Sequence, residues 1–146
     1  MICVDASIAE KWIFAEDHSD QALALASACA RESRRMMAPV LLPFEVTNVI
    51  RKRAIREALT GTEADLAYSR FLAYGVTLTI SEDLHRSALT LAQAYSLPTV
   101  YDAYYIALAQ ALDCSLWTDD RRLLRAVGGP LPFVRWIGDY TDGQTF

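Results

Sequence analysis

Four carboxylates spread over the chain have the residue type and the surroundings for metal chemistry: Asp5, Glu45, Asp102 and Asp120. Each lies at or just past the point where an apolar segment meets the start of a predicted helix. In an α/β fold such positions can converge at one edge of the sheet, where ligands bind. Hard divalent cations such as Mg²⁺ need several oxygen donors, with water completing the shell. The spacing therefore predicts one acidic metal site assembled from distant segments.

Each carboxylate also has an ordinary structural explanation, which is weakest for Asp102. Asp5 fits a helix cap and Glu45 a first-turn acid, and both kinds of residue stabilise a helix without any ligand. Asp102 instead begins a helix whose body, 103–109, is apolar all round and is predicted to be buried. An unpaired buried carboxylate is costly, so a partner such as a metal ion is expected.

The fourth position is ambiguous because Asp119 and Asp120 both follow a predicted strand directly. One of them is expected to cap the next helix and the other to face the sheet edge, and turn geometry does not choose between them. Two polar residues are expected to support the cluster. Ser7 would orient the first carboxylate, and Asn48 lies one helical turn after the second, on the same face.

Strand and helix patterns alternate along the chain. Strands are predicted at 2–4, 36–40, 76–80, 115–118 and 133–137. Helices are predicted from about Ser7, at 21–29, 44–59 and 62–74, after Ser81, across 103–109 and at 119–127. The alternation predicts a single α/β domain, 1–138, with a central parallel sheet of about five strands flanked by helices. A polar tail, 139–146, is expected to follow with little order.

Composition narrows the class of protein. The 146 residues are 53% hydrophobic and 22% charged, which is typical of one globular domain. The formal net charge of −4 neither supports nor excludes a polyanionic substrate, because bound metal would reverse the local field of the acids. Three cysteines without C-x-x-C spacing argue against zinc or disulfides, and His18 and His85 are expected to be ordinary surface residues. Without a signal peptide or an apolar run of ~20 residues, a cytoplasmic protein that does not contact membranes is expected.

The segments around these acids are similar to those of one known family. ICVDASIAEKW resembles its first strand, with an aspartate and a small hydroxyl residue, and APVLLPFEVTNVIRK resembles its glutamate-and-asparagine segment. LPTVYDAYYIALAQAL is close to its aspartate-led buried helix, and SLWTDDRRLLRAV resembles its T-x-D segment. Over nearly its whole length, and in the same order, the chain resembles the PIN-domain ribonucleases, in particular the VapC-like toxins of bacterial and archaeal toxin–antitoxin pairs.

The resemblance implies a PIN-like nuclease domain, an endoribonuclease activity and Mg²⁺ or Mn²⁺ as cofactor. It makes Asp5, Asp102 and Asp120 the metal ligands, and Glu45 a residue that completes the cluster or orients the attacking water. The T-x-D pattern selects the second of the two adjacent acids and adds Thr118 to the supporting residues. A small VapB-like antitoxin protein and a homodimer are also implied.

Basic residues near the second and fourth segments are candidates for contacts to RNA phosphates. A solvated helix face is the ordinary explanation for any single one of them. These residues are Arg51, Lys52, Arg53, Arg56, Arg121, Arg122 and Arg125.

Other classes of protein fit these residues less well. A non-catalytic PIN-fold module that binds a partner, or a housekeeping PIN nuclease without an antitoxin, would share the fold, but every acidic position is filled. A receiver-like domain would need a phosphate-pairing lysine late in the chain, and none follows Lys52. A haloacid-type phosphatase would need an aspartate where Ser7 stands.

Overall fold

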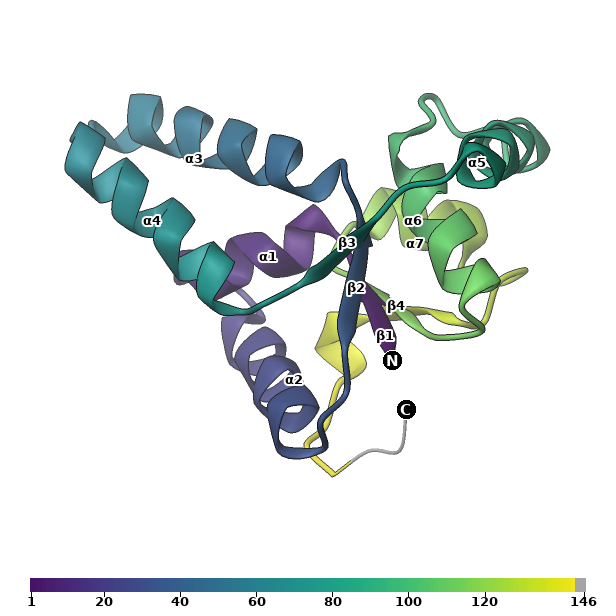
Figure 1. The fold of residues 1–146 in the computed structure, drawn as a ribbon, viewed down its shortest axis with the longest axis horizontal. Helices are drawn as coiled ribbons and strands as arrows, with labels where there is room; N and C mark the ends of the chain where they lie inside the picture. Colours follow the sequence, from purple (N-terminus) through teal and green to yellow (C-terminus); the bar gives the residue numbers. More distant parts are fainter. Residues whose placement is uncertain (144–146) are drawn as a thin grey trace.

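A computed structural model of the protein describes residues 1–143 and contains a parallel sheet (Figure 1). Its strands are β1 (Ile2–Val4), β2 (Met36–Pro39), β3 (Thr77–Thr79), β4 (Leu116–Thr118) and β5 (Val134–Trp136), arranged in the order β3-β2-β1-β4-β5. Every neighbouring pair is parallel. The three strands at the centre of the sheet, β2, β1 and β4, are fully buried, as expected for a sheet covered on both faces. The predicted fold class is confirmed.

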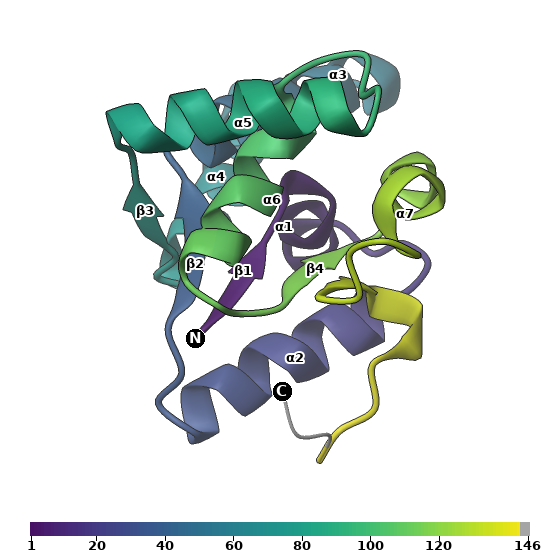
Figure 2. The same ribbon diagram turned by 90° about the vertical axis from the view of Figure 1, so that its right-hand side faces the viewer.

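The helices cover both faces of this sheet. Figure 1 shows α1 and α2 on one side and α6 on the other, with α5 packed against α6. Two further helices, α3 and α4, pack against each other and form an arm that extends away from the sheet (Figures 1 and 2). The helices are α1 (Ala6–Ile13), α2 (Ser19–Arg31), α3 (Leu42–Glu57), α4 (Gly61–Ala73), α5 (Glu82–Ala94), α6 (Tyr101–Ala111), α7 (Arg121–Val127) and the short 3₁₀ turn η1 (Ile137–Asp139).

Short polar side chains set where several of these helices begin. Asp5 caps α1 and Asp120 caps α7, each by accepting two backbone N–H groups of the first turn. Thr60 and Glu63 form a reciprocal capping box at α4. Ser81 accepts the N–H of Leu84 at the start of α5, which confirms the predicted cap. The two caps that belong to candidate site residues therefore also fix the chain direction just after β1 and β4.

The core is built around α6, the helix that the sequence predicts to be apolar all round. Its residues Ala103 and Ile106 have no solvent exposure, and the helix packs on β1, β2 and β4. Burial on this scale supplies most of the stability of such a domain, at about 25 cal/mol per Å² of apolar surface. Asp102 is thereby held at the first turn of the most deeply packed helix.

The chain remains packed beyond Gly138. The ring of Tyr140 is 4% exposed and lies edge-on against Trp117 at 5.5 Å, and Arg31 donates to Asp142 at 2.6 Å. Of the tail expected at 139–146, residues 144–146 lie outside the described part of the chain. No helix within residues 1–143 has the length and apolarity that crossing a membrane requires.

Candidate active site

The strand order creates a topological switch point beside β1. The chain runs outward from β1 to β2 and β3, then returns to place β4 on the other side of β1. Loops leaving the carboxyl ends of β1 and β4 therefore diverge, and such a crevice is where open α/β sheets bind ligands. Asp5 follows β1 and Asp120 follows β4, so these two predicted residues lie at the same edge of the sheet.

Asp5 is held rigidly at this edge. Its side chain is 7% exposed, and Oδ1 accepts the backbone N–H groups of Ser7 at 3.0 Å and Ile8 at 3.2 Å. The Ser7 hydroxyl donates to the same oxygen at 2.6 Å. A further hydrogen bond comes from Thr118. The carboxylate thus has a fixed orientation before any ligand arrives, which is what a metal ligand requires of its surroundings.

The hydroxyl groups of Ser7 and Thr118 also join the two loops. The Ser7 oxygen accepts the backbone N–H of Asp119 at 2.7 Å, and the Thr118 oxygen accepts that of Asp120 at 2.9 Å. The two hydroxyl oxygens lie 3.5 Å apart. Two of the three predicted supporting residues, Ser7 and Thr118, therefore lie between the first and fourth carboxylates, whereas Asn48 is exposed on α3.

The adjacent acids Asp119 and Asp120 have different tasks. Asp120 caps α7, with Oδ1 accepting the N–H groups of Arg122 at 2.7 Å and Leu123 at 3.2 Å. It also raises the pKa of Asp102 by repulsion, which places it near that residue. Asp119 turns instead toward the buried ammonium of Lys11, 2.8 Å away. One residue thus serves both as cap and as member of the acidic cluster.

Asp102 and Glu45 complete the cluster from two further helices. Asp102 lies in the first turn of α6, which follows α5 through a loop and does not follow a strand. Glu45 lies in the first turn of α3, and its Oε2 accepts a short hydrogen bond from the hydroxyl of Tyr105. Because Tyr105 is one helical turn after Asp102, the same face of α6 carries both the carboxylate and the tyrosine that holds Glu45.

The acids perturb one another electrostatically. Burial raises the pKa of Asp5 from 3.8 to about 7, with repulsion from Asp102 adding to it. Burial and then Asp102 raise the pKa of Glu45, and burial and then Asp120 raise that of Asp102. Burial and the nearby Glu45 raise the pKa of Tyr105, which keeps its hydroxyl protonated as a donor. Asp102 is therefore the centre of the cluster, coupled to each of the other three acids.

The donor set fits a hydrated divalent cation. Within residues 1–143 no Lys, Arg or His lies at ion-pair distance from Asp5, Glu45 or Asp102, although Arg122 lowers the pKa of Asp102 from a greater distance. Over the same residues no three Asp, Glu, His or Cys side chains stand close enough to enclose an ion directly. Mg²⁺ keeps several of its waters and binds through one or two carboxylates, so a set of oxygens spaced around a hydrated ion suits it.

Basic residues lie unevenly around the cluster. Arg122 is exposed, with its guanidinium 3.6 Å from Asp120, and Arg121 stacks 3.4 Å above the ring of Trp136. On α3, the residues that follow Glu45 and are exposed include Asn48, Arg51, Lys52 and Arg56. Arg125 on α7 is also exposed.

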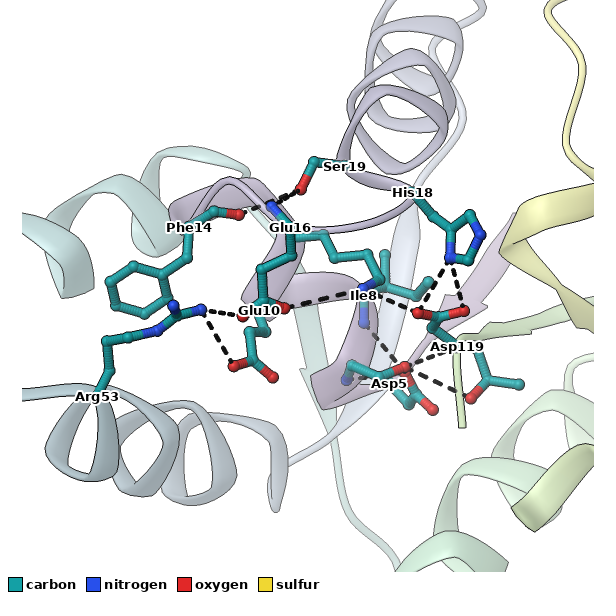
Figure 3. Close-up of polar contacts among 12 residues, drawn as sticks. Asp5, Ile8, Glu10, Phe14, Glu16, His18, Ser19, Arg53 and Asp119 are labelled. Carbon is teal, nitrogen blue, oxygen red and sulfur yellow. Dashed lines mark hydrogen bonds and ion pairs between the residues drawn. The ribbon is translucent and has the colours of Figure 1, made fainter. Parts of the chain in front are cut away.

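Arg53 does not fit the predicted role of an RNA contact. It is 9% exposed, its guanidinium bonds to Glu16 and Glu57, and it packs 4.5 Å over the ring of Phe14 (Figure 3). The reason is its spacing: Arg53 lies three residues after the buried Ile50, on the apolar stripe of α3. It ties α3 to α1 and to the loop after it.

The sequence patterns did not predict an ion network that lies beside the site and includes the buried Lys11. Asp119 contacts the ring of His18 at 3.2 Å (Figure 3). It also pairs with Lys11 and accepts the indole N–H of Trp136 at 2.7 Å. Burial opposes ionisation, but the hydrogen bonds from these partners bring the pKa of Asp119 below its usual range. His18 is thus a structural partner rather than an ordinary surface residue. The only local signal was the placement of Lys11 in the apolar last turn of α1.

Comparison with known proteins agrees with this geometry. The family model described as PIN domain matches residues 2–129, which include all four acids. A VapC ribonuclease of Mycobacterium bovis and ribonuclease VapC9 of Mycobacterium tuberculosis are each 30% identical to the chain over 123 residues, covering 84% of this chain and 88% of the relative. The chain belongs to the PIN-domain family, among its VapC-type members.

Proposed function

We propose that this protein is a divalent-metal-dependent endoribonuclease and the toxin of a toxin–antitoxin pair. The observation that carries the proposal is the cluster of Asp5, Glu45 and Asp102 at the switch point of the sheet, each with a raised pKa and, within residues 1–143, without a cation at ion-pair distance. The relatives named as VapC ribonucleases support the choice of RNA as substrate.

We assign metal binding, orientation of the attacking water and positioning to different residues of the cluster. Asp5, Asp102 and Asp120 would hold Mg²⁺ or Mn²⁺, in part through water. Bound there, the cation would activate a water and neutralise the charge that builds up on the phosphate and the leaving oxygen. Glu45, fixed by the hydroxyl of Tyr105, would accept a hydrogen bond from the attacking water and orient it. Ser7 and Thr118 keep the Asp5 carboxylate in one orientation.

Substrate positioning would fall to the exposed cations at the two ends of the crevice. Arg51 and Lys52 extend from α3, and Arg121 and Arg122 from the first turn of α7. Contacts to phosphates fix the register of a nucleic acid without reading its sequence. The acids would then meet a scissile phosphate whose neighbours are held on both sides.

Partners of the protein are part of the proposal. The arm of α3 and α4 exposes Ile55, Leu66 and Leu72, each at least half accessible. Exposed apolar side chains concentrated on one arm are a feature of surfaces that bind proteins. We assign a small antitoxin protein as a partner and a homodimer as the assembly, with a cytoplasmic location that suits an RNA substrate.

The proposal is tested by cleavage of single-stranded RNA by the parent protein, Asp102→Asn and the control Asp65→Asn, whose residue is exposed on α4. Asp102→Asn is expected to lower kcat about 100-fold or more, because several kcal/mol of transition-state stabilisation are lost. The control should cleave like the parent, and a chelator should stop both. A parent protein that cleaves no RNA with metal present would favour a non-catalytic PIN-fold module.

A further inference from the structure

In Figure 2, β3 leads into α5, which lies above α6. The side chains at this junction line an apolar groove beside the acidic cluster. It encloses about 250 Å³ and is lined by side chains that include Leu41, Phe44, Ile80, Tyr101 and Tyr104. This volume is below the ~300–1,000 Å³ of pockets for drug-sized ligands, so a single small ring system fits it better. Elements that hold the catalytic candidates form its walls.

The groove and the acids use adjacent stripes of the same two helices. On α6, Tyr101 and Tyr104 line the groove, whereas Asp102 and Tyr105, one residue further on, face Glu45. On α3, Phe44 lines the groove and its neighbour is Glu45. Neighbouring side chains of α3 and α6 therefore line the groove and carry the acids, so the groove adjoins the cluster.

Two aromatic rings that line this groove are exposed to solvent. Phe44 is 73% exposed and Tyr101 is 54% exposed, which is far more than rings of a packed core. Aromatic faces of this kind stack on the bases of single-stranded RNA, because every base presents a flat π-face. Phosphates are disfavoured in the groove, since its walls are apolar and charged contacts lie elsewhere.

The groove also contains one polar pair. Nδ1 of His85 and the hydroxyl of Tyr104 lie 2.7 Å apart, with the two rings perpendicular at 5.5 Å. Hydroxyl and imidazole groups can each donate or accept a second hydrogen bond, so this pair can meet the edge of a base that stacks nearby. Apolar walls with a few placed polar groups are the usual make-up of a site for a small flat ligand.

We propose that this groove binds a nucleobase of the RNA, one that flanks the scissile phosphate, and that Phe44 and Tyr101 select it by stacking. The inference rests on the proposed ribonuclease function and adds the place where base identity is sensed. The His85–Tyr104 pair contributes hydrogen bonds to the base edge. A second copy of the chain is the other candidate occupant, and continuity with the acids and the presence of the polar pair favour the base.

The test uses a labelled single-stranded RNA that the parent protein cleaves at one position, chosen from a random pool. Versions of this RNA with one abasic nucleotide, placed in turn on each side of the cut, are compared by kcat/KM. For the parent, one abasic position is expected to cost about tenfold or more, the usual effect of losing one stacked base. Tyr101→Ala should lose activity on the intact RNA and no longer respond to that position.

Two variants serve as controls. Tyr101→Trp keeps a stacking face and should retain the abasic penalty, and Leu23→Ala, at an exposed site on α2, should behave like the parent. An abasic profile that is the same in the parent and in Tyr101→Ala would overturn the inference. The inference would also be overturned if Tyr101→Ala kept the abasic profile but was a monomer where the parent is a dimer, as measured by light scattering. The groove would then be an interface between copies.

Failure of the proposed function can be told apart from failure of this inference. If the parent cleaves no RNA, binding of a mixed-sequence RNA oligomer is compared with binding of an abasic oligomer of equal length by fluorescence anisotropy. A preference for the oligomer with bases that Tyr101→Ala removes would support the nucleobase site without any cleavage. Equal preference in parent and variant would overturn it.

Discussion

Asp102 and Tyr105, one helical turn apart on α6, organise the acidic cluster. Asp102 repels Asp5 and Glu45 and is itself repelled by Asp120, so each acid depends on the charge of the others. The hydroxyl of Tyr105 stays protonated and donates a hydrogen bond to Glu45. The chemistry of the site therefore depends on one helix face whose position the core fixes.

Removing the Tyr105 hydroxyl should alter the ionisation of Glu45 without unfolding the protein. The hydrogen bond from Tyr105 lowers the pKa of Glu45, against the effect of burial. In Tyr105→Phe that pKa rises, so the acidic limb of the pH–rate profile is expected to move to higher pH and kcat to fall about tenfold. Tyr68→Phe on α4 is the control. An unchanged profile in Tyr105→Phe would show that Glu45 takes no part in catalysis.

Asp5 should make the metal-free protein less stable as pH rises. Its pKa is about 7 when folded and 3.8 when exposed, so between these values the folded state holds the extra proton. Stability is then lost as pH rises from about 4 to about 7, and the loss is a few kcal/mol at about 1.4 kcal/mol per pKa unit.

Thermal unfolding of chelator-treated protein at about pH 5 and about pH 8 measures this dependence. The parent should have the lower Tm at the higher pH, and Asp5→Asn should lose most of that difference. Added Mg²⁺ should restore the parent at the higher pH but not the variant. A parent that gains stability over this interval would contradict a raised pKa for the buried Asp5 carboxyl.

Packing between elements depends on two buried cations, Lys11 and Arg53. Lys11 on α1 holds Asp119 after β4, and Arg53 on α3 holds Glu16 after α1. Lys11 thus joins α1 to the loop after β4, and Arg53 joins the far part of α3 to the loop after α1. Buried cations of this kind contribute more to specific geometry than to net stability.

Lys11→Met should destabilise the protein, because it leaves the partly buried Asp119 with two partners in place of three. The expected loss is about 2–4 kcal/mol in the free energy of unfolding, measured with urea. Lys52→Met, at an exposed site, should change stability by less than about 0.5 kcal/mol. Equal stability of Lys11→Met and the parent would show that Asp119 is satisfied by His18 and Trp136 alone.

The strands and helices could be predicted from the sequence because the patterns that specify them involve residues close together in the chain. Apolar runs and helical spacing predict each strand and helix within a few residues, and Ser81 marks the start of α5. The surroundings of Asp119 were not predictable, since its partners lie at positions 11, 18 and 136 and meet only in the folded chain. The helical spacing of Arg53 from Val46 and Ile50 indicates a buried position. Its charge argued for the exposed position that was predicted instead.

Across the whole molecule, the acidic crevice and the exposed arm lie on parts of the fold that different partners can reach. The arm of α3 and α4 extends from the sheet, while α3 also carries Glu45 at its other end (Figure 1). A protein bound along the arm would therefore lie on the same helix as the site. This arrangement suits a nuclease whose activity is restrained by a protein partner.

Expression of the protein in a bacterial host is expected to arrest growth, because uncontrolled RNA cleavage depletes essential transcripts. Co-expression of the small protein encoded next to it should relieve the arrest, and Asp102→Asn should not cause one. Growth of the host is followed by optical density, with Asp65→Asn as the matched control. Arrest by Asp102→Asn as strong as that by the parent would point to a toxicity that does not use the acidic site.

Calorimetric titration of Mn²⁺ into chelator-treated protein tests most directly whether the scattered acids form one metal site. The parent and Asp65→Asn should bind Mn²⁺ alike, and Asp102→Asn should bind it at least about tenfold more weakly, a loss of about 1.4 kcal/mol or more. Equal binding by the parent and Asp102→Asn, or no binding by the parent, would contradict a metal site centred on Asp102.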